Sequence, residues 1–200
     1  MDKIKHLTEI AKNLDVYDLA YPVLINDKFS WWSGSSKPTS HHYGRGGLLD
    51  HTTEVIDSCL LMSDYYKQHK INNKLLFLAA LYHDYGKIYD YDYIPERQND
   101  GFFYGCDENG RLISTTILES WTSNKHKSLI HHISRSGLFW NEIAKSKNLP
   151  EYEIDEVLHC ILSHHGVDPE AGSPVPPQTR MAWILHLCDN MSASLDKIKE

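Results

Sequence analysis

The spacing of apolar residues along the chain predicts a mostly helical protein. Over most of the sequence apolar side chains recur every three to four residues, which is the period of one face of an α-helix. The segment NKLLFLAALYHDYG is apolar on every side, so its helix is expected to be buried nearly all round. The pattern predicts six or seven helical segments, which we place at about 3–20, 47–69, 73–86, 126–147, 151–165 and 177–197.

Two stretches break this helical period. Residues 26–47 are rich in Gly, Ser and Pro and predict a loop, in which Trp31 and Trp32 are expected to anchor the chain on the core. In residues 88–115 the alternating run IYDYDY and an Asn-Gly turn signal predict a small β-hairpin or an irregular insertion. The sequence contains no internal repeat, low-complexity tract or linker, so we expect one domain over residues 1–200.

Composition and charge narrow the class of protein. With 41% hydrophobic and 24% charged residues, and no stretch of roughly 18 apolar residues, the sequence is typical of a globular protein without a membrane partner. Its start lacks the apolar core of an export signal and its four cysteines are far apart, so we expect a cytoplasmic protein with reduced thiols. A net charge of −7 disfavours binding along a long nucleic acid but leaves small phosphate-bearing ligands and short oligonucleotides as partners.

The placement of histidines and aspartates carries the candidate chemistry. The chain has 13 histidines, and several of them, together with two aspartates, follow apolar runs that should face the core. A buried imidazole or ionised carboxylate is costly without a partner, and a shared metal ion removes that cost. The candidate metal ligands are His51, His83, Asp84, His132, His164, His165 and Asp189.

Asp84 has two carboxylate oxygens and can therefore bridge two ions. One ion would lie among His51, His83, Asp84 and Asp189. A second would lie among Asp84, His132, His164 and His165. Mixed imidazole and carboxylate ligands suit Mn, Fe, Co, Ni or Zn better than Mg or Ca, so we expect one or two divalent transition-metal ions as cofactors.

Parts of this pattern have ordinary structural alternatives. His83 and Asp84 alone would also suit a hydrogen-bonded pair at the end of a helix. His164 and His165 stand before a glycine, where cations are favoured by the helix dipole. All of these features arising independently along one chain is much less probable than a shared metal site.

The order His, His-Asp, His, His-His, Asp over residues 41–190 is similar to that of the HD-domain superfamily of metal-dependent phosphohydrolases. More narrowly, the motifs HHYGRGGLLDHT, ALYHDYGK, LIHHI, ILSHHG and LHLCDN resemble the HD domain of YhaM-like 3′–5′ exoribonucleases. This resemblance implies an all-α helical bundle, of the HD type, that carries the 88–115 insertion. It also implies hydrolysis of a phosphoester in a nucleotide, cyclic nucleotide or short oligonucleotide by a metal-activated hydroxide.

Side chains near the ligands are candidates for catalysis and substrate binding. Asp84 and Lys87 are the candidate catalytic residues, with Lys87 stabilising charge on a phosphate oxygen; its alternative is a solvated lysine at a helix end. Arg45 is a second candidate phosphate contact. His41 and His42 are candidates for binding phosphate or for donating a proton to the leaving group.

Two departures from the family pattern leave the substrate open. His131 stands where the family usually has a glycine before its third histidine, and the 88–125 segment is longer than in many relatives, which suggests a wall or lid over the site. A di-iron oxygenase of the same fold and a non-catalytic nucleotide-binding module are the alternative functions. The 48 residues from Asp84 to His132 exceed the usual spacing of the oxygenases, which weakens the first alternative. The second is weakened because every ligand position is retained, whereas a non-catalytic relative could lose some of them.

Overall fold

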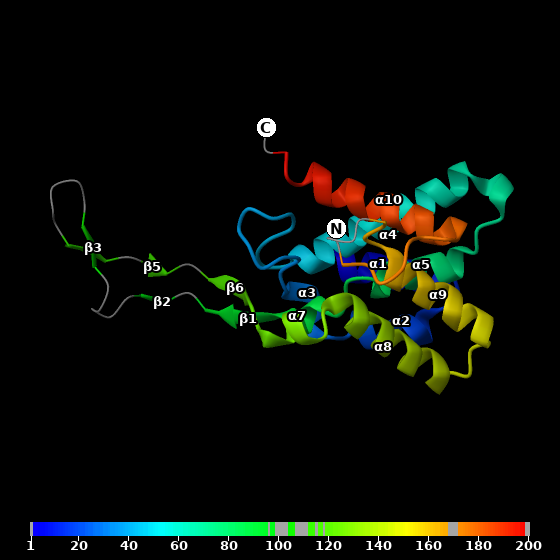
Figure 1. The fold of residues 1–200 in the computed structure, drawn as a ribbon, viewed down its shortest axis with the longest axis horizontal. Coiled ribbons are helices and arrows are strands. Elements are labelled where there is room, and N and C mark those ends of the chain that lie inside the picture. The colour runs from blue at the N-terminus through cyan, green and yellow to red at the C-terminus, as the bar shows by residue number, and fades with distance from the viewer. Residues whose placement is uncertain are drawn as a thin grey trace.

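A nearly buried helix, α5 (Asn73–Tyr82), forms the centre of a helical bundle (Figure 1). Every residue from Leu75 to Tyr82 is buried, as the all-round apolar sequence predicts. The computed structural model of the chain describes residues 2–95, 97–98, 104–106, 112–114, 116–117, 119–167 and 172–198, and gives only the backbone of the strand residues between 97 and 117. Among these residues, no helix combines the length and apolar character that a membrane crossing requires.

Four longer helices enclose α5. Helix α4 (Gly47–Tyr65) packs against α5 and α10 (Arg180–Leu195), while α9 (Glu151–Ser163) packs against α5, α10 and α8 (His132–Ser146). The bundle therefore brings residues from both ends of the chain to one core. This arrangement confirms the all-α fold class predicted from the sequence.

The N-terminal region contains more breaks than its periodicity predicts. The single helix expected over 3–20 is two helices, α1 (Lys3–Asn13) and α2 (Tyr17–Leu24). They are separated at Asp15, whose φ of 56° is a left-handed conformation that ends a helix. The predicted loop contains a short helix, α3 (Asp27–Trp31), but Trp32 is buried and contacts Trp121 edge to face, as its anchoring role predicts.

A ribbon of paired strands interrupts the helices where the sequence predicts an insertion. It begins after a short helix, α6 (Lys87–Asp90), so its bounds are 91 to 123 rather than 88 to 115. The Asn-Gly turn signal lies outside the described residues. The strands pair antiparallel as β1–β6, β2–β5 and β3–β4, with bounds Tyr91–Ile94, Arg97–Gln98, Tyr104–Cys106, Leu112–Ser114, Thr116–Ile117 and Ser120–Ser123 for β1 to β6.

The ribbon is attached to the bundle by aromatic side chains at its base. Trp121 on β6 is buried and packs against Trp31, Trp32 and Tyr93. Strands β2, β3 and β5 extend away from the helices beyond β1 and β6 (Figure 1). In this structure they do not form the lid suggested by the length of the insertion.

The predicted helix over 126–147 is broken before the candidate ligand His132. It consists of α7 (Lys125–Leu129) and α8, and His131 between them has φ 67° and ψ 146°. A non-glycine residue in this region costs about 1–3 kcal/mol of backbone strain. The break lets α8 begin at His132, directly beside the residues that follow α5.

Candidate metal centre

The side chains of His51, His83, Asp84 and Asp189 form one buried group (first group). His51 comes from α4, His83 and Asp84 follow the end of α5, and Asp189 comes from α10. The Nε2 atom of His51 lies 3.0 Å from Asp189 Oδ1, 3.4 Å from Asp84 Oδ2 and 3.3 Å from His83 Nε2. Ligands that share a metal at about 2.1 Å lie roughly 3.0–3.5 Å from one another, so these spacings are those of a coordination shell.

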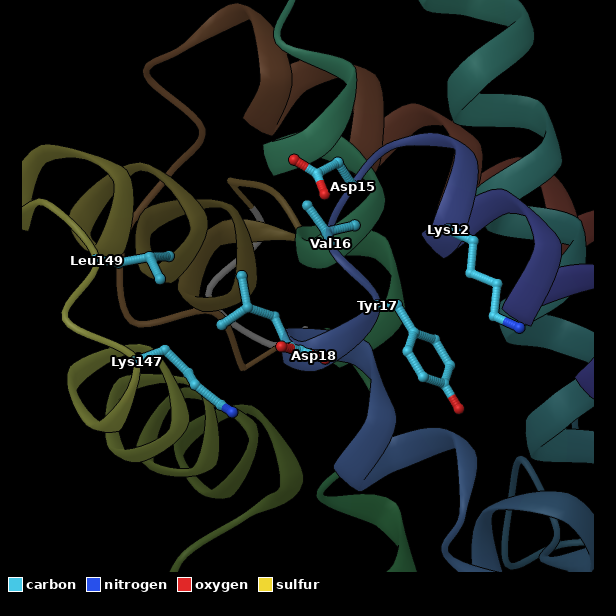
Figure 2. Close-up of a pocket in the computed structure, with 8 residues that line it drawn as sticks. Lys12, Asp15, Val16, Tyr17, Asp18, Lys147 and Leu149 are labelled. Atoms are coloured by element: carbon cyan, nitrogen blue, oxygen red, sulfur yellow. The ribbon is translucent and has the colours of Figure 1, made fainter.

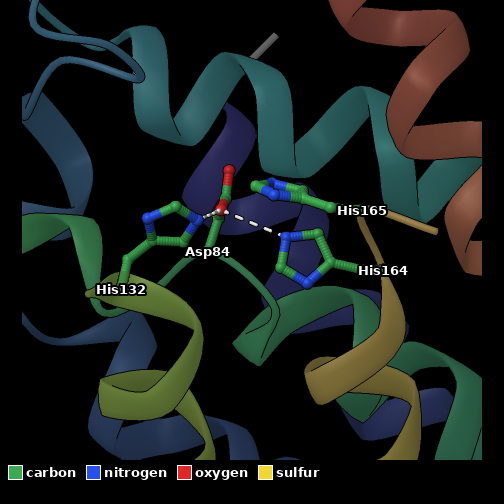
Figure 3. A group of neighbouring side chains, drawn as sticks. All are labelled: Asp84, His132, His164 and His165. Atoms are coloured by element: carbon green, nitrogen blue, oxygen red, sulfur yellow. Dashed lines mark ion pairs between the residues drawn. The ribbon is translucent and has the colours of Figure 1, made fainter. Parts of the chain in front are cut away.

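Asp84 also belongs to a second group, with His132, His164 and His165 (Figure 3). Its Oδ1 atom lies 3.3 Å from His132 Nε2 and 3.7 Å from His164 Nε2. Its Oδ2 atom faces the first group instead. The structure therefore brings all seven predicted ligands together and places the Asp84 carboxylate between two clusters.

The ends of two helices orient two of the histidines in the same way. His83 and His164 are the residues that directly follow α5 and α9, where the last carbonyl groups lack a helical partner. In each case the Nδ1–H group donates to the carbonyl three residues earlier, at 2.7 Å, to Ala80 for His83 and to Ile161 for His164. This bond fixes the tautomer and directs the Nε2 lone pair into the cluster.

The other two buried histidines are oriented by side chains. His51 Nδ1 donates to Ser192 Oγ at 3.0 Å, and that hydroxyl donates to Glu54 at 2.8 Å. His132 Nδ1 donates to Asp90 Oδ2 at 3.2 Å, and the same carboxylate oxygen accepts the His132 backbone N–H at 3.1 Å. All four imidazoles therefore turn Nε2 toward the cluster.

The buried atoms of the second group test whether a metal would fit. Asp84 Oδ1, His132 Nε2 and His164 Nε2 are fully buried and have no hydrogen-bond partner among the described residues. An unpaired buried polar atom costs about 1–3 kcal/mol, and here three of them face one another. These donor atoms fit a divalent ion, which would bind all three at once.

Electrostatics of the first group agree with a site for a cation. Burial disfavours a charged His51, but hydrogen bonds to Asp189 and Asp84 outweigh this effect and raise its pKa to about 9. Burial alone would raise the pKa values of Asp84 and Asp189, yet both values lie well below the usual range. For Asp84 the main opposing cause is the charge of Lys87, and for Asp189 it is the hydrogen bond from His51. Without a metal ion, the protonated His51 imidazole therefore supplies the positive charge that faces the two aspartates.

Lys87 is buried beside the candidate metal centre. Its ammonium group lies 2.5 Å from Asp84 Oδ2, and this carboxylate raises the lysine pKa above its ordinary value in spite of burial. The solvated helix-end alternative is therefore wrong. Lys87 also lines a cavity that adjoins the second group.

A cavity of about 360 Å³ adjoins the second group. Its volume lies in the range of small-molecule sites. The wall on the side of the candidate metal centre includes His41, Lys87, His131, His132 and His165, and the rest of the wall includes further lysines and serines. Among the strand residues that the structure describes, Tyr91 at the base of the ribbon lines this cavity. A ligand bound in this cavity would contact both the candidate metal centre and positively charged side chains.

Of the three candidate substrate contacts, the structure brings only His41 to this cavity. Burial, followed by repulsion from Lys87, lowers the pKa of His41 to about 3, so the imidazole is neutral near pH 7. A neutral imidazole can donate a hydrogen bond but does not deliver a proton as imidazolium does. His41 therefore suits substrate binding better than proton donation.

Arg45 and His42 are held elsewhere. Arg45 forms an ion pair of 2.7 Å with Glu119 and lies over the ring of Trp31, which ties the base of the ribbon to the loop before α4. His42 contacts Glu54 at 3.1 Å through Nε2, and its backbone N–H donates to Asp196. In this structure neither side chain lines the cavity, because each has a charged partner of its own.

A larger cavity, of about 450 Å³, lies at the junction of α1 and α2 near the end of α8 (Figure 2). Its wall includes Lys12, Asp15, Tyr17, Asp18 and Lys147. None of the predicted ligands or substrate contacts lines it. Size alone therefore does not identify the candidate site, whereas the chemistry of the wall does.

Sequence reasoning missed two residues of the centre, Asp90 and Ser192. Both are buried polar residues that hydrogen-bond to a histidine of the candidate ligand set. Asp90 lies between two tyrosines in an alternating run that predicts a strand, and Ser192 lies three residues after Asp189 on α10. That spacing of three on a helix, which places both residues on one face, is the signal that would have found Ser192.

Comparison with known families places this geometry in context. The family model described as HD domain matches residues 48–194, which is nearly three quarters of the chain. The matched range contains all seven candidate ligands, from His51 to Asp189. No solved structure matches the chain.

Proposed function

Because the chain belongs to the HD-domain family, we propose that its two His/Asp groups form a metal centre that hydrolyses a phosphoester. The proposed substrate is a nucleotide, a cyclic nucleotide or a short oligonucleotide. HD domains bind divalent metals, and the observation that carries the proposal is the position of Asp84, whose two oxygens face two separate groups of ligands.

Divalent ions bound at such a centre would activate water and polarise phosphoryl oxygens. The protein's own residues supply the remaining requirements. Lys87 adds a fixed positive charge beside Asp84, where negative charge grows on a phosphoryl group during hydrolysis. His41 and His131, on the cavity wall, are placed to donate hydrogen bonds to phosphate oxygens.

The restricted size of the cavity supports a small substrate. A volume of about 360 Å³ suits a compact ligand rather than a long polymer, in agreement with the net charge of −7. An exonuclease of the YhaM-like type would bind only the end of an RNA strand here. We include this narrower function, a YhaM-like 3′–5′ exoribonuclease, in the proposal.

The proposal is tested with purified protein, first by metal analysis and then by hydrolysis. The substrate panel contains nucleotides, cyclic nucleotides and short oligonucleotides, each incubated with and without Mn²⁺. We expect metal-dependent release of nucleoside, nucleotide or phosphate. Two bound irons with consumption of O₂ would instead support an oxygenase, and tight binding without turnover would support a nucleotide-binding module.

The variant that tests the centre is Asp84→Ala. We expect it to lose metal and to lose at least about a thousandfold in kcat/KM, since it removes the ligand shared by both groups. The matched control is Asp64→Ala, which removes an exposed aspartate of α4 and should keep full activity. An Asp84→Ala protein as active as the control would contradict the proposed function.

A further inference from the structure

Three lysines other than Lys87 line the cavity beside the metal centre: Lys37, Lys127 and Lys197. None of the three forms an ion pair with an aspartate or glutamate among the residues that the structure describes. Such a gathering of uncompensated positive charge is unusual in a protein whose net charge is −7. It favours a negatively charged partner that the described part of the chain does not provide.

Lys127 is the most constrained of these lysines. It is half-buried, its ammonium lies over the ring of Tyr91, and it donates to Ser36 Oγ at 3.4 Å and to Ser123 Oγ at 3.5 Å. The residues that contact Lys127 lie in three separate segments: Ser36 in the loop before α4, Ser123 on β6 and Tyr91 on β1. The ammonium is therefore held in one place rather than moving freely in solvent.

The hydroxyl of Ser36 is oriented by the same contacts. Ser36 Oγ accepts hydrogen bonds from both Lys127 and Ser123, the latter at 2.8 Å. Because these bonds occupy its acceptor positions, its own proton is left to be donated elsewhere. Ser36 lines the cavity, so a hydroxyl donor and an ammonium face the same space.

Lys87 and Lys127 differ in what they contact. Lys87 is paired with Asp84 at the metal centre, whereas Lys127 contacts hydroxyl groups and not a metal ligand. Burial, together with repulsion from Lys87 and Lys37 and despite attraction by Asp90, lowers the pKa of Lys127. Because Lys127 donates only to hydroxyl groups among the described residues, its ammonium remains available to a negatively charged ligand.

We propose that Lys127, Ser36 and Lys37 form a second anion subsite, which binds a phosphate group of the substrate other than the one hydrolysed at the metal centre. The inference rests on the proposed function and narrows its substrate to compounds with at least two phosphate groups. Ammonium and hydroxyl donors are the groups that bind phosphate oxygens. The two phosphates can be adjacent, as in a nucleoside diphosphate, or separated by a sugar, as in a 5′-phosphorylated dinucleotide.

The experiment compares substrates that differ by one phosphate. AMP is compared with ADP, and the dinucleotide ApA with its 5′-phosphorylated form pApA, using the metal-loaded protein. We expect the extra phosphate to lower KM by roughly tenfold or more in one of these pairs, the size expected for charge-assisted hydrogen bonds. The pair that shows the effect distinguishes adjacent from separated phosphates.

Lys127→Met removes the charge but keeps the apolar stem over Tyr91, and Lys125→Met is the matched control on the same short helix. We expect the advantage of the extra phosphate to disappear in Lys127→Met and to persist in Lys125→Met. An advantage that persists in both variants, or that is absent from the unmodified protein, would overturn the second subsite.

Binding of inorganic pyrophosphate to the metal-free protein, measured by calorimetry, separates the two proposals. If no substrate is hydrolysed by any form of the protein, the proposed function fails, and the subsite is then judged by binding alone. We expect pyrophosphate to bind at least about tenfold more weakly to Lys127→Met than to Lys125→Met. Equal affinities would overturn the subsite even if hydrolysis is observed.

Discussion

Four buried histidines present the same nitrogen, Nε2, to the candidate metal centre. Each does so because its Nδ1–H group already donates to a fixed acceptor, a helix-end carbonyl for two of them and a serine or aspartate side chain for the others. The geometry is thus established before any metal binds. A pre-oriented ligand set loses less conformational entropy when it takes up an ion.

The Asp90 carboxylate holds His132 through two hydrogen bonds, to its backbone N–H and to its imidazole. Asp90→Asn weakens the acceptor that holds His132 in place, so we expect metal affinity to fall roughly 10- to 100-fold while the fold is retained. Competition with a chromogenic chelator measures this affinity, and circular dichroism checks the fold. Asp92→Asn, at an exposed position on β1, is the control and should bind metal normally. Equal affinities of the two variants would show that Asp90 does not position the ligand.

The raised pKa of His51 predicts the pH dependence of metal binding. At about 9 it lies above the ordinary value of 6.5, so the metal-free imidazole is charged at pH 7 and must lose its proton before it can bind a metal. The pKa values of His83 and His132 are lowered, mainly by burial, so these residues have no proton to release. Metal affinity should therefore rise with pH, by up to about tenfold per unit, and level off near pH 9. Calorimetry in buffers of different ionisation enthalpy should detect about one proton released per chain at pH 7, and a value near zero would contradict the pKa assignment.

The predicted ligands could be found from the sequence because each follows an apolar run whose direction into the core is set by helical periodicity. Residues such as Asp90 and Lys127 could not be found in this way. Their roles depend on contacts with His132 and Ser36, which are distant in sequence. Arg45 was predicted to be a phosphate contact, but its ion pair with Glu119, which is distant in sequence, could not be foreseen.

At the scale of elements, the turn after α5 decides how close Asp84 lies to α8. Gly86 in this turn donates its N–H to Ser136 Oγ at 2.8 Å. A Cβ atom at this position would overlap the carbonyl oxygen of His132 and lie 2.9 Å from the Cβ of Arg135. The absence of a side chain therefore allows the two ligand-bearing segments to meet.

Gly86→Ala should separate these segments. We expect a loss of about 1–3 kcal/mol in the free energy of unfolding, because the methyl group meets backbone atoms that cannot move aside. We also expect weaker metal binding, since Asp84 and His132 would move apart. Gly137→Ala is the control: its methyl group meets the end of the flexible Leu158 side chain, so the effect should be smaller. Urea denaturation of both metal-free variants measures the difference, and equal stabilities would contradict the close-approach argument.

Helices with a strong apolar period were predicted correctly, whereas their interruptions were not. The breaks occur at Asp15 and His131, both with positive φ, and neither is a glycine or proline that would mark a break in the sequence. The bounds of the ribbon were misplaced because Tyr89 and Asp90 alternate like strand residues but belong to α6. Short alternating runs carry too few residues to separate one helical turn from a strand.

On the scale of the whole molecule, the candidate metal centre joins segments from most of the bundle. Its ligands come from α4, the end of α5, the start of α8, the end of α9 and α10. An ion bound in either group would therefore connect helices that are far apart in sequence, and it would stabilise the folded chain by mass action. Four lysines, Lys37, Lys87, Lys127 and Lys197, line the cavity next to it, although the net charge of the protein is −7.

If Asp84 joins two metal sites, the number of metal ions bound per chain depends on this one carboxylate. Metal-free protein is loaded with Mn²⁺ and the excess ion is removed. The number of metal ions bound per chain is then measured by elemental mass spectrometry. We expect about two ions per chain in the unmodified protein, one in Asp189→Ala, which belongs only to the first group, and none in Asp84→Ala. An Asp84→Ala protein that retains as many ions as the unmodified chain would contradict the account.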